Sequence, residues 1–275
     1  MPLVANARMY SVAPAAAEAW DALFRAVSHS SGVPLEIVAH PFPAPVSELW
    51  KRRDLGLAFM CGWPWVRDLP RRPRIYDVVP VAAPLPAGAP GPRYWTDLVV
   101  HRDHPARSLM ELEGARIGYT LLDSQSGFSA LRHHLLAAPA PRFAEIVGPI
   151  TTPRRVLEAI GEGRVDLAPV DSYAHALLRR HEPGHAAQCR VLGRTEPTAM
   201  PLLVAGRGAD PALLARLQAA LLALDDPALL EPLALLGFTR PLPQAEYAVM
   251  EQRAQAAERA GVHDLTHFLQ ARRVA

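Results

Sequence analysis

Short apolar runs alternate with amphipathic runs along most of the chain, and this alternation restricts the fold more than any other feature. Residues 3–9, 35–39 and 55–60 have the composition of strands, and residues 15–27 carry the apolar spacing of a helix. Strands that alternate with helices favour an α/β fold with a largely parallel sheet. A chain of 275 residues can form one large domain or two smaller ones.

A polar turn, Ser124-Gln125-Ser126-Gly127, stands where a strand-like run passes into a helix-like run that begins at Ser129. The first amides of a helix have no partners within the helix, and the helix dipole adds partial positive charge there. Serine hydroxyls can donate hydrogen bonds to the same place. The turn therefore predicts an oxyanion site, and a serine helix cap beside a glycine is the plainer alternative.

A second polar turn, Asp171-Ser172-Tyr173, follows the apolar run 165–170 and opens a helix-like run. Ligands of open α/β sheets bind beyond the carboxyl ends of the strands. We therefore expect this turn and the Ser124–Gly127 turn to face one cleft.

These two turns belong to a longer series of segments whose order resembles one known family. The other segments are Asn6–Tyr10, Asp54–Pro64 and Arg93–Val100, so that the series covers most of the chain up to about residue 205. Together they resemble the phosphonate-binding-protein-like family, which comprises substrate-binding proteins of ABC transporters with the type 2 periplasmic-binding-protein fold.

The resemblance implies an α/β, two-lobe type 2 periplasmic-binding-protein fold with the ligand cleft between the lobes. Lobe 1 would contain residues 1–99 and 199–275, including the C-terminal helices, and lobe 2 would be the inserted segment 100–198. It also implies a solute-binding protein of an ABC-type transporter that binds a small oxyanion, such as phosphate, phosphonate or a related organic anion. Its partners would be that ligand and an ABC permease, and we expect a monomer.

The resemblance also implies which residues contact the ligand. Ser124, Ser126 and Gly127 would hold the anionic group, and Asp171 would face a cationic or hydroxyl group of the ligand, or a protonated anion. One departure is the turn Gly148–Thr152, where related sequences often carry a Gly-Ser-His-like turn, so a histidine that could help to hold an anion is absent. The full expected set is Tyr10, Cys61, Gly62, Tyr94, Ser124, Gln125, Ser126, Gly127, Thr151 and Asp171.

The main alternative is an enzyme on the same scaffold, of the menaquinone or thiamine-precursor biosynthesis type, and a ligand-sensing module is a third. No acid–base pair or activated nucleophile supports the enzyme, and packing explains Cys61 better than nucleophilic attack does. His181-Glu182-Pro183-Gly184-His185 has the spacing of a zinc-protease helix. Proline and glycine in its middle disfavour that helix, so we expect neither a metal nor a cofactor.

Composition excludes several other classes of protein. The net charge of +2 gives no sign of nucleic-acid binding. Because no apolar run reaches the ~18 residues of a membrane span, we do not expect a membrane-spanning protein. The N-terminus lacks the basic start and apolar run of an export signal. The sequence thus predicts a periplasmic location if a signal peptide has been removed, and a cytoplasmic one otherwise.

Overall fold

The structure is a computed structural model that describes residues 2–137 and 139–271, and it divides into two compact units. Unit 1 contains the chain up to Tyr94 and the segment Ala199–Tyr247; unit 2 contains Trp95–Thr198 and the chain from Ala248 on. Two short paired strands, β5 (Arg93–Tyr94) and β11 (Thr198–Ala199), lie where the chain passes from one unit to the other.

Unit 1 is built on a mixed sheet whose strand order is β13-β4-β12-β3-β1-β2. Strands β1, β2 and β3 run parallel, whereas β12 is antiparallel to both β3 and β4, and β13 is antiparallel to β4. Every residue of β1, β3 and β12 is buried, which explains why these runs are apolar except for Asn6, whose side chain donates to the Val38 carbonyl at 2.8 Å. The strands are β1 (Leu3–Asn6), β2 (Leu35–Ile37), β3 (Leu55–Met60), β4 (Val78–Pro86), β12 (Leu202–Gly206) and β13 (Leu235–Thr239).

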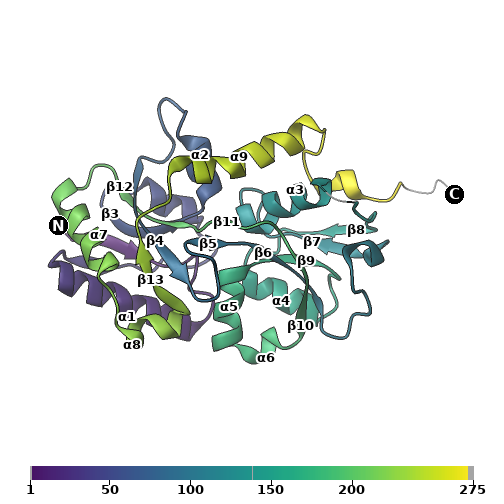
Figure 1. Ribbon diagram of the computed structural model, residues 1–275, viewed down its shortest axis with the longest axis horizontal. Coiled ribbons are helices and arrows are strands. Elements are labelled where there is room, and N and C mark those ends of the chain that lie inside the picture. The colour runs from purple at the N-terminus through teal and green to yellow at the C-terminus, as the bar shows by residue number, and fades with distance from the viewer. Residues whose placement is uncertain (1, 138, 272–275) are drawn as a thin grey trace. The chain divides into compact units, whose positions relative to one another are not determined.

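The longest helix of unit 1, α1 (Pro14–Ser31), buries an apolar stripe that includes Trp20, Leu23, Phe24 and Val27. Proline at its first turn and Gly32 at its left-handed C-cap set its two ends. Helix α7 (Pro211–Leu222) lies beside α1 (Figure 1). The remaining helical segments of this unit are η1 (Val46–Lys51), α2 (Gly62–Asp68), α8 (Pro227–Leu230) and η4 (Glu231–Leu233).

Unit 2 contains an antiparallel sheet of order β10-β6-β9 and a parallel pair, β7 and β8. A parallel bridge between Ile117 of β7 and Leu167 joins the pair to the β9 side of the sheet. Strands β8, β7 and β9 therefore run in one direction and end at one edge, which we call the carboxyl edge of unit 2. The strands are β6 (Thr96–His101), β7 (Arg116–Gly118), β8 (Glu145–Val147), β9 (Ala168–Asp171) and β10 (Cys189–Arg194).

Helices cover the strands of unit 2 on two sides, with α3 on one side and α4 and α5 on the other (Figure 1). A π-helix, η3 (Gln125–Ser129), runs directly into α3 (Ala130–Ala137). The other helical segments are η2 (Leu109–Leu112), α4 (Pro153–Gly161), α5 (Ser172–His181), α6 (Pro183–Ala186) and η5 (Leu265–Phe268). Helix α5 ends at His181 and α6 starts at Pro183, so His181 and His185 do not share the helix that a zinc-protease motif requires.

The observed units differ from the expected lobes in two places. Unit 2 begins at Trp95 rather than at residue 100, because β6 starts at Thr96 and pairs with β9 and β10 along its whole length. The second difference is the C-terminal tail, which was expected in lobe 1, whereas the chain from Ala248 on belongs to unit 2.

The C-terminal tail joins unit 2 through a shared core and a buried guanidinium. Helix α9 (Gln244–Arg259) starts in unit 1 and continues into unit 2. Beyond Ala248 the tail adds Ala257, Val262, Leu265 and Phe268 to a core that also contains Phe128 and Leu131. Arg132 of α3, 3% exposed, donates to the carbonyl oxygens of Ala254 and His263 at 3.1 and 2.8 Å. These contacts fix the tail to α3.

Candidate functional site

Three expected ligand segments follow the three parallel strands of unit 2. The Ser124–Gly127 turn comes after β7, Thr151 after β8, and Asp171 ends β9. Backbone hydrogen bonds from Tyr119 to Val147 and from Ile150 to Tyr119, of 3.1 and 2.9 Å, hold the first two segments together. Since the strands end at one edge, the structure brings these segments to the carboxyl edge of unit 2, where sheet folds bind ligands.

Ser124 caps the helix that follows the first turn. Its Oγ accepts a hydrogen bond from the N–H of Gly127 at 3.0 Å, so the hydroxyl proton of Ser124 remains available for a second partner. The N–H of Gly127 is used inside the turn and is not offered to a ligand. A Cβ on Gly127 would lie 1.7 Å from the Thr120 Oγ1 atom, so packing against Thr120 explains the glycine.

The open start of the π-helix supplies backbone donors. Among the described residues, no carbonyl accepts the N–H groups of Gln125 and Ser126, whereas the N–H of Ser129 donates to Ser124 O at 3.0 Å. The carbonyl of Ser126 accepts a hydrogen bond from Thr96 Oγ1 at 3.0 Å. Two unused N–H groups at a helix start, with two serine hydroxyls beside them, form an arrangement suited to an anion.

Several polar atoms on the same segments are buried without a partner among the described residues. They are Gln125 Oε1, Ser129 Oγ and Thr151 Oγ1, and the Gln125 and Ser129 side chains are 2% and 1% exposed. Thr151 also has a φ of 69°, a strained left-handed conformation for a β-branched residue. Buried polar atoms are nearly always hydrogen-bonded in proteins, so unpaired ones on adjacent segments indicate a place for a ligand or water.

Asp171 caps helix α5 with one carboxylate oxygen. Its Oδ1 accepts hydrogen bonds from the N–H groups of Tyr173 and Ala174 at 2.9 and 3.0 Å. Across the sheet Asp171 pairs with Thr96, the residue that holds the Ser126 carbonyl. Burial and the nearby Asp171 carboxylate raise the pKa of the Tyr173 hydroxyl well above its ordinary value. A carboxylate acceptor therefore lies next to the segment that carries the anion donors.

The remaining expected site residues belong to unit 1. Tyr10 follows β1 and is fully buried, with its ring edge-on to Phe59 at a centroid distance of 4.8 Å. Cys61 and Gly62 join β3 to α2, and the Cys61 thiol lies 3.9 Å from the Met9 sulfur. Tyr94 forms part of β5 and is 1% exposed. The carboxyl ends of β1 and β3 thus carry Tyr10, Cys61 and Gly62, and ligand contact at these residues remains a prediction.

Two residues of the carboxyl edge were missed by the sequence analysis. Thr96 stands at the start of a strand between Trp95 and Asp97, where threonine is common for its β propensity alone. Ser129 stands four residues after Gln125, at a helical position where serine is ordinary. Their positions beside the turn appear only when the strand register and the π-helix are known.

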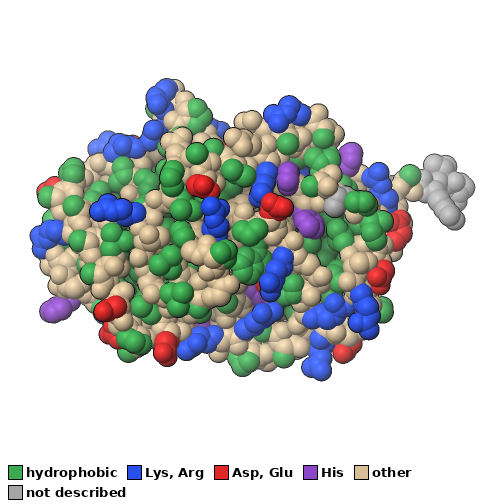
Figure 2. Space-filling view, in the orientation of Figure 1, with side chains coloured by type: hydrophobic (Ala, Val, Ile, Leu, Met, Phe, Trp, Pro, Cys, Tyr) green, Lys and Arg blue, Asp and Glu red, His purple; other side chains and the backbone are tan. Residues whose placement is uncertain are grey.

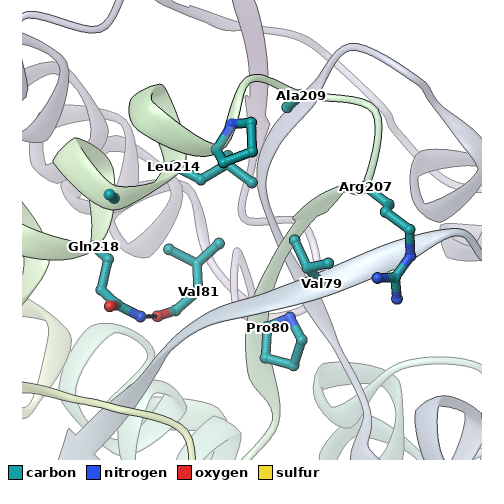
Figure 3. A pocket seen from close by; sticks show the side chains of 9 residues that line it. Val79, Pro80, Val81, Arg207, Ala209, Leu214 and Gln218 are labelled. Atoms are coloured by element: carbon teal, nitrogen blue, oxygen red, sulfur yellow. Dashed lines mark hydrogen bonds between the residues drawn. The ribbon is translucent and has the colours of Figure 1, made fainter.

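A surface groove in unit 1 does not coincide with the predicted site. It has a volume of ≈ 340 Å³ and lies between β4 and α7, with Val79, Val81, Ala209 and Leu214 in its lining (Figure 3). Its polar side chains are already paired, because Arg207 donates to Asp77 and Gln218 donates to the Val81 carbonyl. The groove contains none of the ten expected contact residues, and the polar atoms of the carboxyl edge of unit 2 suit an anion better.

On the face drawn in Figure 2, basic side chains stand at many separate points with acidic ones among them. Within residues 2–137 and 139–271, no helix is long and apolar enough to cross a membrane. The same residues contain no group of three or more His, Cys, Asp or Glu side chains that could hold a metal ion.

In a comparison with known protein families, residues 11–247 match one family. It is the family "ABC transporter, phosphonate, periplasmic substrate-binding protein". The chain belongs to this family. This membership confirms the resemblance inferred from the order of the sequence segments, and its members are transporter receptors rather than enzymes. A comparison with curated proteins finds no match.

Solved structures of low sequence identity share the fold of this phosphonate-type binding protein. A binding protein component of an ABC phosphonate transporter from Pseudomonas aeruginosa has a TM-score of 0.74 at 16% identity, covering 94% of this chain and 88% of its own. PhnD1 from Prochlorococcus marinus, in complex with methylphosphonate, has a TM-score of 0.77 at 14% identity, covering 93% and 98%. A Xanthomonas citri protein bound to ATP has a TM-score of 0.64 at 20% identity, covering 95% and 98%. These matches confirm the type 2 periplasmic-binding-protein fold.

Proposed function

We propose that this substrate-binding protein binds a small phosphate- or phosphonate-type oxyanion at the carboxyl edge of unit 2. The observation that carries the proposal is the open helix start, where the N–H groups of Gln125 and Ser126 have no acceptor within the described chain. The hydroxyls of Ser124 and Ser126 would donate beside them. Two structural relatives, bound to methylphosphonate and to ATP, hold ligands with tetrahedral phosphorus oxyanions, which supports this chemistry.

The acceptors beside the turn narrow the choice of anion. The Asp171 carboxylate would repel a fully ionised oxyanion unless a proton or a cationic group lies between them. Gln125 Oε1 is a second buried acceptor without a partner in the described chain. We therefore infer that the ligand carries a hydrogen-bond donor next to its anionic oxygens, either a P–OH proton or an ammonium or hydroxyl group.

Thr151 belongs to the turn in which related sequences often carry a histidine, and we infer that it donates to the anion instead. Its Oγ1 is buried and unpaired in the described chain, and a hydroxyl there can donate one hydrogen bond without adding positive charge. We infer that anion binding in this chain depends on neutral donors and the helix start. From family membership we further propose that the loaded protein delivers its ligand to an ABC permease in the periplasm.

Isothermal titration calorimetry of the purified chain tests the ligand class. Methylphosphonate and inorganic phosphate keep a P–OH proton in a large fraction of molecules near pH 6, whereas sulfate has none. We expect methylphosphonate or phosphate to bind at least about tenfold more tightly than sulfate, because sulfate has no proton to donate and would leave a buried acceptor unpaired. Asp171→Asn keeps a side chain that caps helices well and should reduce this preference. Equal binding of all three anions by the wild type would contradict the proposal.

A further inference from the structure

A polar cluster at the start of β6 holds the elements that carry the proposed ligand site. The cluster consists of Trp95, Thr96 and Asp97 with the side chains that they contact in unit 2. Thr96 donates from Oγ1 to the Ser126 carbonyl, and its own N–H donates to Thr195 Oγ1 at 3.0 Å. Trp95 exchanges two hydrogen bonds with Ser172, one from Trp95 N to Ser172 Oγ at 3.1 Å and one from Ser172 N to Trp95 O at 3.0 Å.

Asp97 is the charged centre of this cluster and is 3% exposed. Its Oδ2 lies 2.8 Å from His175 Nδ1, and its Oδ1 accepts from Trp95 Nε1 at 2.9 Å and from Arg194 Nε at 3.3 Å. Burial acts to raise the pKa of Asp97, but hydrogen bonds from His175 and Trp95 and the charge of Arg194 outweigh it, so the pKa lies below the ordinary value. The carboxylate therefore stays ionised and keeps all three donors in place.

The cluster reaches both polar segments of the carboxyl edge. Thr96 touches the π-helix through Ser126, and Ser172 and His175 belong to helix α5, which Asp171 caps. A buried, ionised carboxylate with three donors fixes the start of β6 strongly, because loss of the His175 contact would leave the buried Oδ2 of Asp97 without its donor. Rigid support of this kind is what a binding site needs in order to hold its donors in place before the ligand arrives.

We propose that Thr96, with Asp97 and His175 behind it, is a positioning residue that holds the Ser124–Ser129 turn in its ligand-binding geometry. The proposal rests on the proposed function for the ligand, but the positioning itself is a property of the ligand-free protein. It assigns a role to an Asp–His pair that no sequence motif indicated. The pair acts through the strand and does not itself contact the anion.

Hydrogen exchange of the ligand-free full chain tests the positioning directly. The amides of Gly127 and Ser129 report on the turn, because both donate to Ser124. Thr96→Val keeps the side-chain shape but removes the donor to the Ser126 carbonyl, and we expect about tenfold faster exchange at both amides. His175→Leu should have a similar effect, because it leaves Asp97 without that donor. His175→Asn should restore slow exchange, because its side-chain N–H can occupy the place of Nδ1–H.

Asp166→Asn is the matched control. Asp166 is another carboxylate of unit 2, paired to Arg116 at 2.8 Å at the opposite ends of β7 and β9. The Asp166→Asn variant should exchange the Arg116 amide hydrogen faster, because in wild type that N–H donates to the Asp166 carboxylate. Exchange at the amides of Gly127 and Ser129 should not change. If Thr96→Val is unfolded by circular dichroism, the comparison of His175→Leu with His175→Asn decides the question. If Thr96→Val and His175→Leu are folded and the amides of Gly127 and Ser129 exchange at the wild-type rate in them, the proposal is overturned.

Titration with methylphosphonate separates this proposal from the proposed function. If wild type binds the probe, Thr96→Val should weaken binding by about tenfold or more, and Asp166→Asn should not. If wild type does not bind any phosphorus oxyanion but the turn still exchanges faster in Thr96→Val, the proposed ligand is wrong and the positioning role stands. If binding is strong and insensitive to Thr96→Val, the positioning role is wrong and the ligand assignment stands.

Discussion

Replacing both Ser124 and Ser126 by alanine removes two hydroxyl donors from the proposed anion site. Ser124 also caps the helix through its 3.0 Å hydrogen bond to the Gly127 N–H, and loss of such a cap costs about 1 kcal/mol of folding free energy. Each hydrogen bond from a hydroxyl to a charged oxyanion contributes roughly 1.5–3 kcal/mol to binding. The lower limit for the pair is therefore about 3 kcal/mol, or roughly a hundredfold loss of affinity.

Calorimetric titration with methylphosphonate measures this loss, and thermal unfolding without ligand measures the cost to the fold. Ser108→Ala provides the control, since Ser108 stands before the helical turn η2 of the same unit and its hydroxyl contacts only Glu111 among the described side chains. We expect the double variant to melt a few degrees lower and to bind about a hundredfold more weakly, while Ser108→Ala keeps its affinity. Undiminished affinity in a folded double variant would show that the turn does not hold the ligand.

Three further predictions concern the supports of the site. Gly127→Ala places a Cβ 1.7 Å from Thr120 Oγ1, so it should lower the melting temperature and weaken methylphosphonate binding, and a variant with wild-type values in both assays would refute the packing argument. Arg132→Met should reduce the free energy of unfolding by about 2–4 kcal/mol in urea titrations, because the carbonyls of Ala254 and His263 lose a charged donor; unchanged unfolding would show that the tail does not depend on it. Burial acts to raise the pKa of Asp166, but hydrogen bonds from Arg116 outweigh it, so the folded-state pKa lies below the ordinary value of 3.8. The carboxylate therefore stabilises the fold above pH 3.8, and this stabilisation is lost as the pH falls through the lowered pKa. The difference in unfolding free energy between wild type and Asp166→Asn should shrink between pH 5 and about 2, and a constant difference would contradict this.

The alternation of apolar runs was sufficient to predict the α/β class and most of the strands. The expectation of a largely parallel sheet was wrong, because β12 and β13 pair antiparallel in unit 1 and β6 pairs antiparallel with β9 and β10 in unit 2. The Ser124–Gly127 turn was also predictable as a helix start, because a serine cap after a strand depends on local sequence alone. The roles of the individual residues within that turn could not be predicted from the sequence. The N–H of Gly127 bonds Ser124 instead of remaining open, and only the three-dimensional packing of Thr120 against the glycine explains why no other residue fits.

Long-range contacts account for the parts that sequence reasoning missed. Asp97 and His175 are 78 positions apart, and neither belongs to a motif. The amphipathic pattern of α9 shows that one face is buried but does not say which unit buries it, so the sequence could not predict that the chain from Ala248 on belongs to unit 2. Its place is decided by Arg132, whose contacts with Ala254 and His263 span more than a hundred residues.

A crystal structure of the chain grown with methylphosphonate tests the central claim most directly. We expect phosphonate oxygens within about 2.7–3.2 Å of the Ser124 and Ser126 hydroxyls and of the N–H groups of Gln125 and Ser126, with a P–OH or other donor facing Asp171. Phosphonate bound elsewhere, for example beside Arg207 in the groove between β4 and α7, with the turn of unit 2 unoccupied, would contradict it.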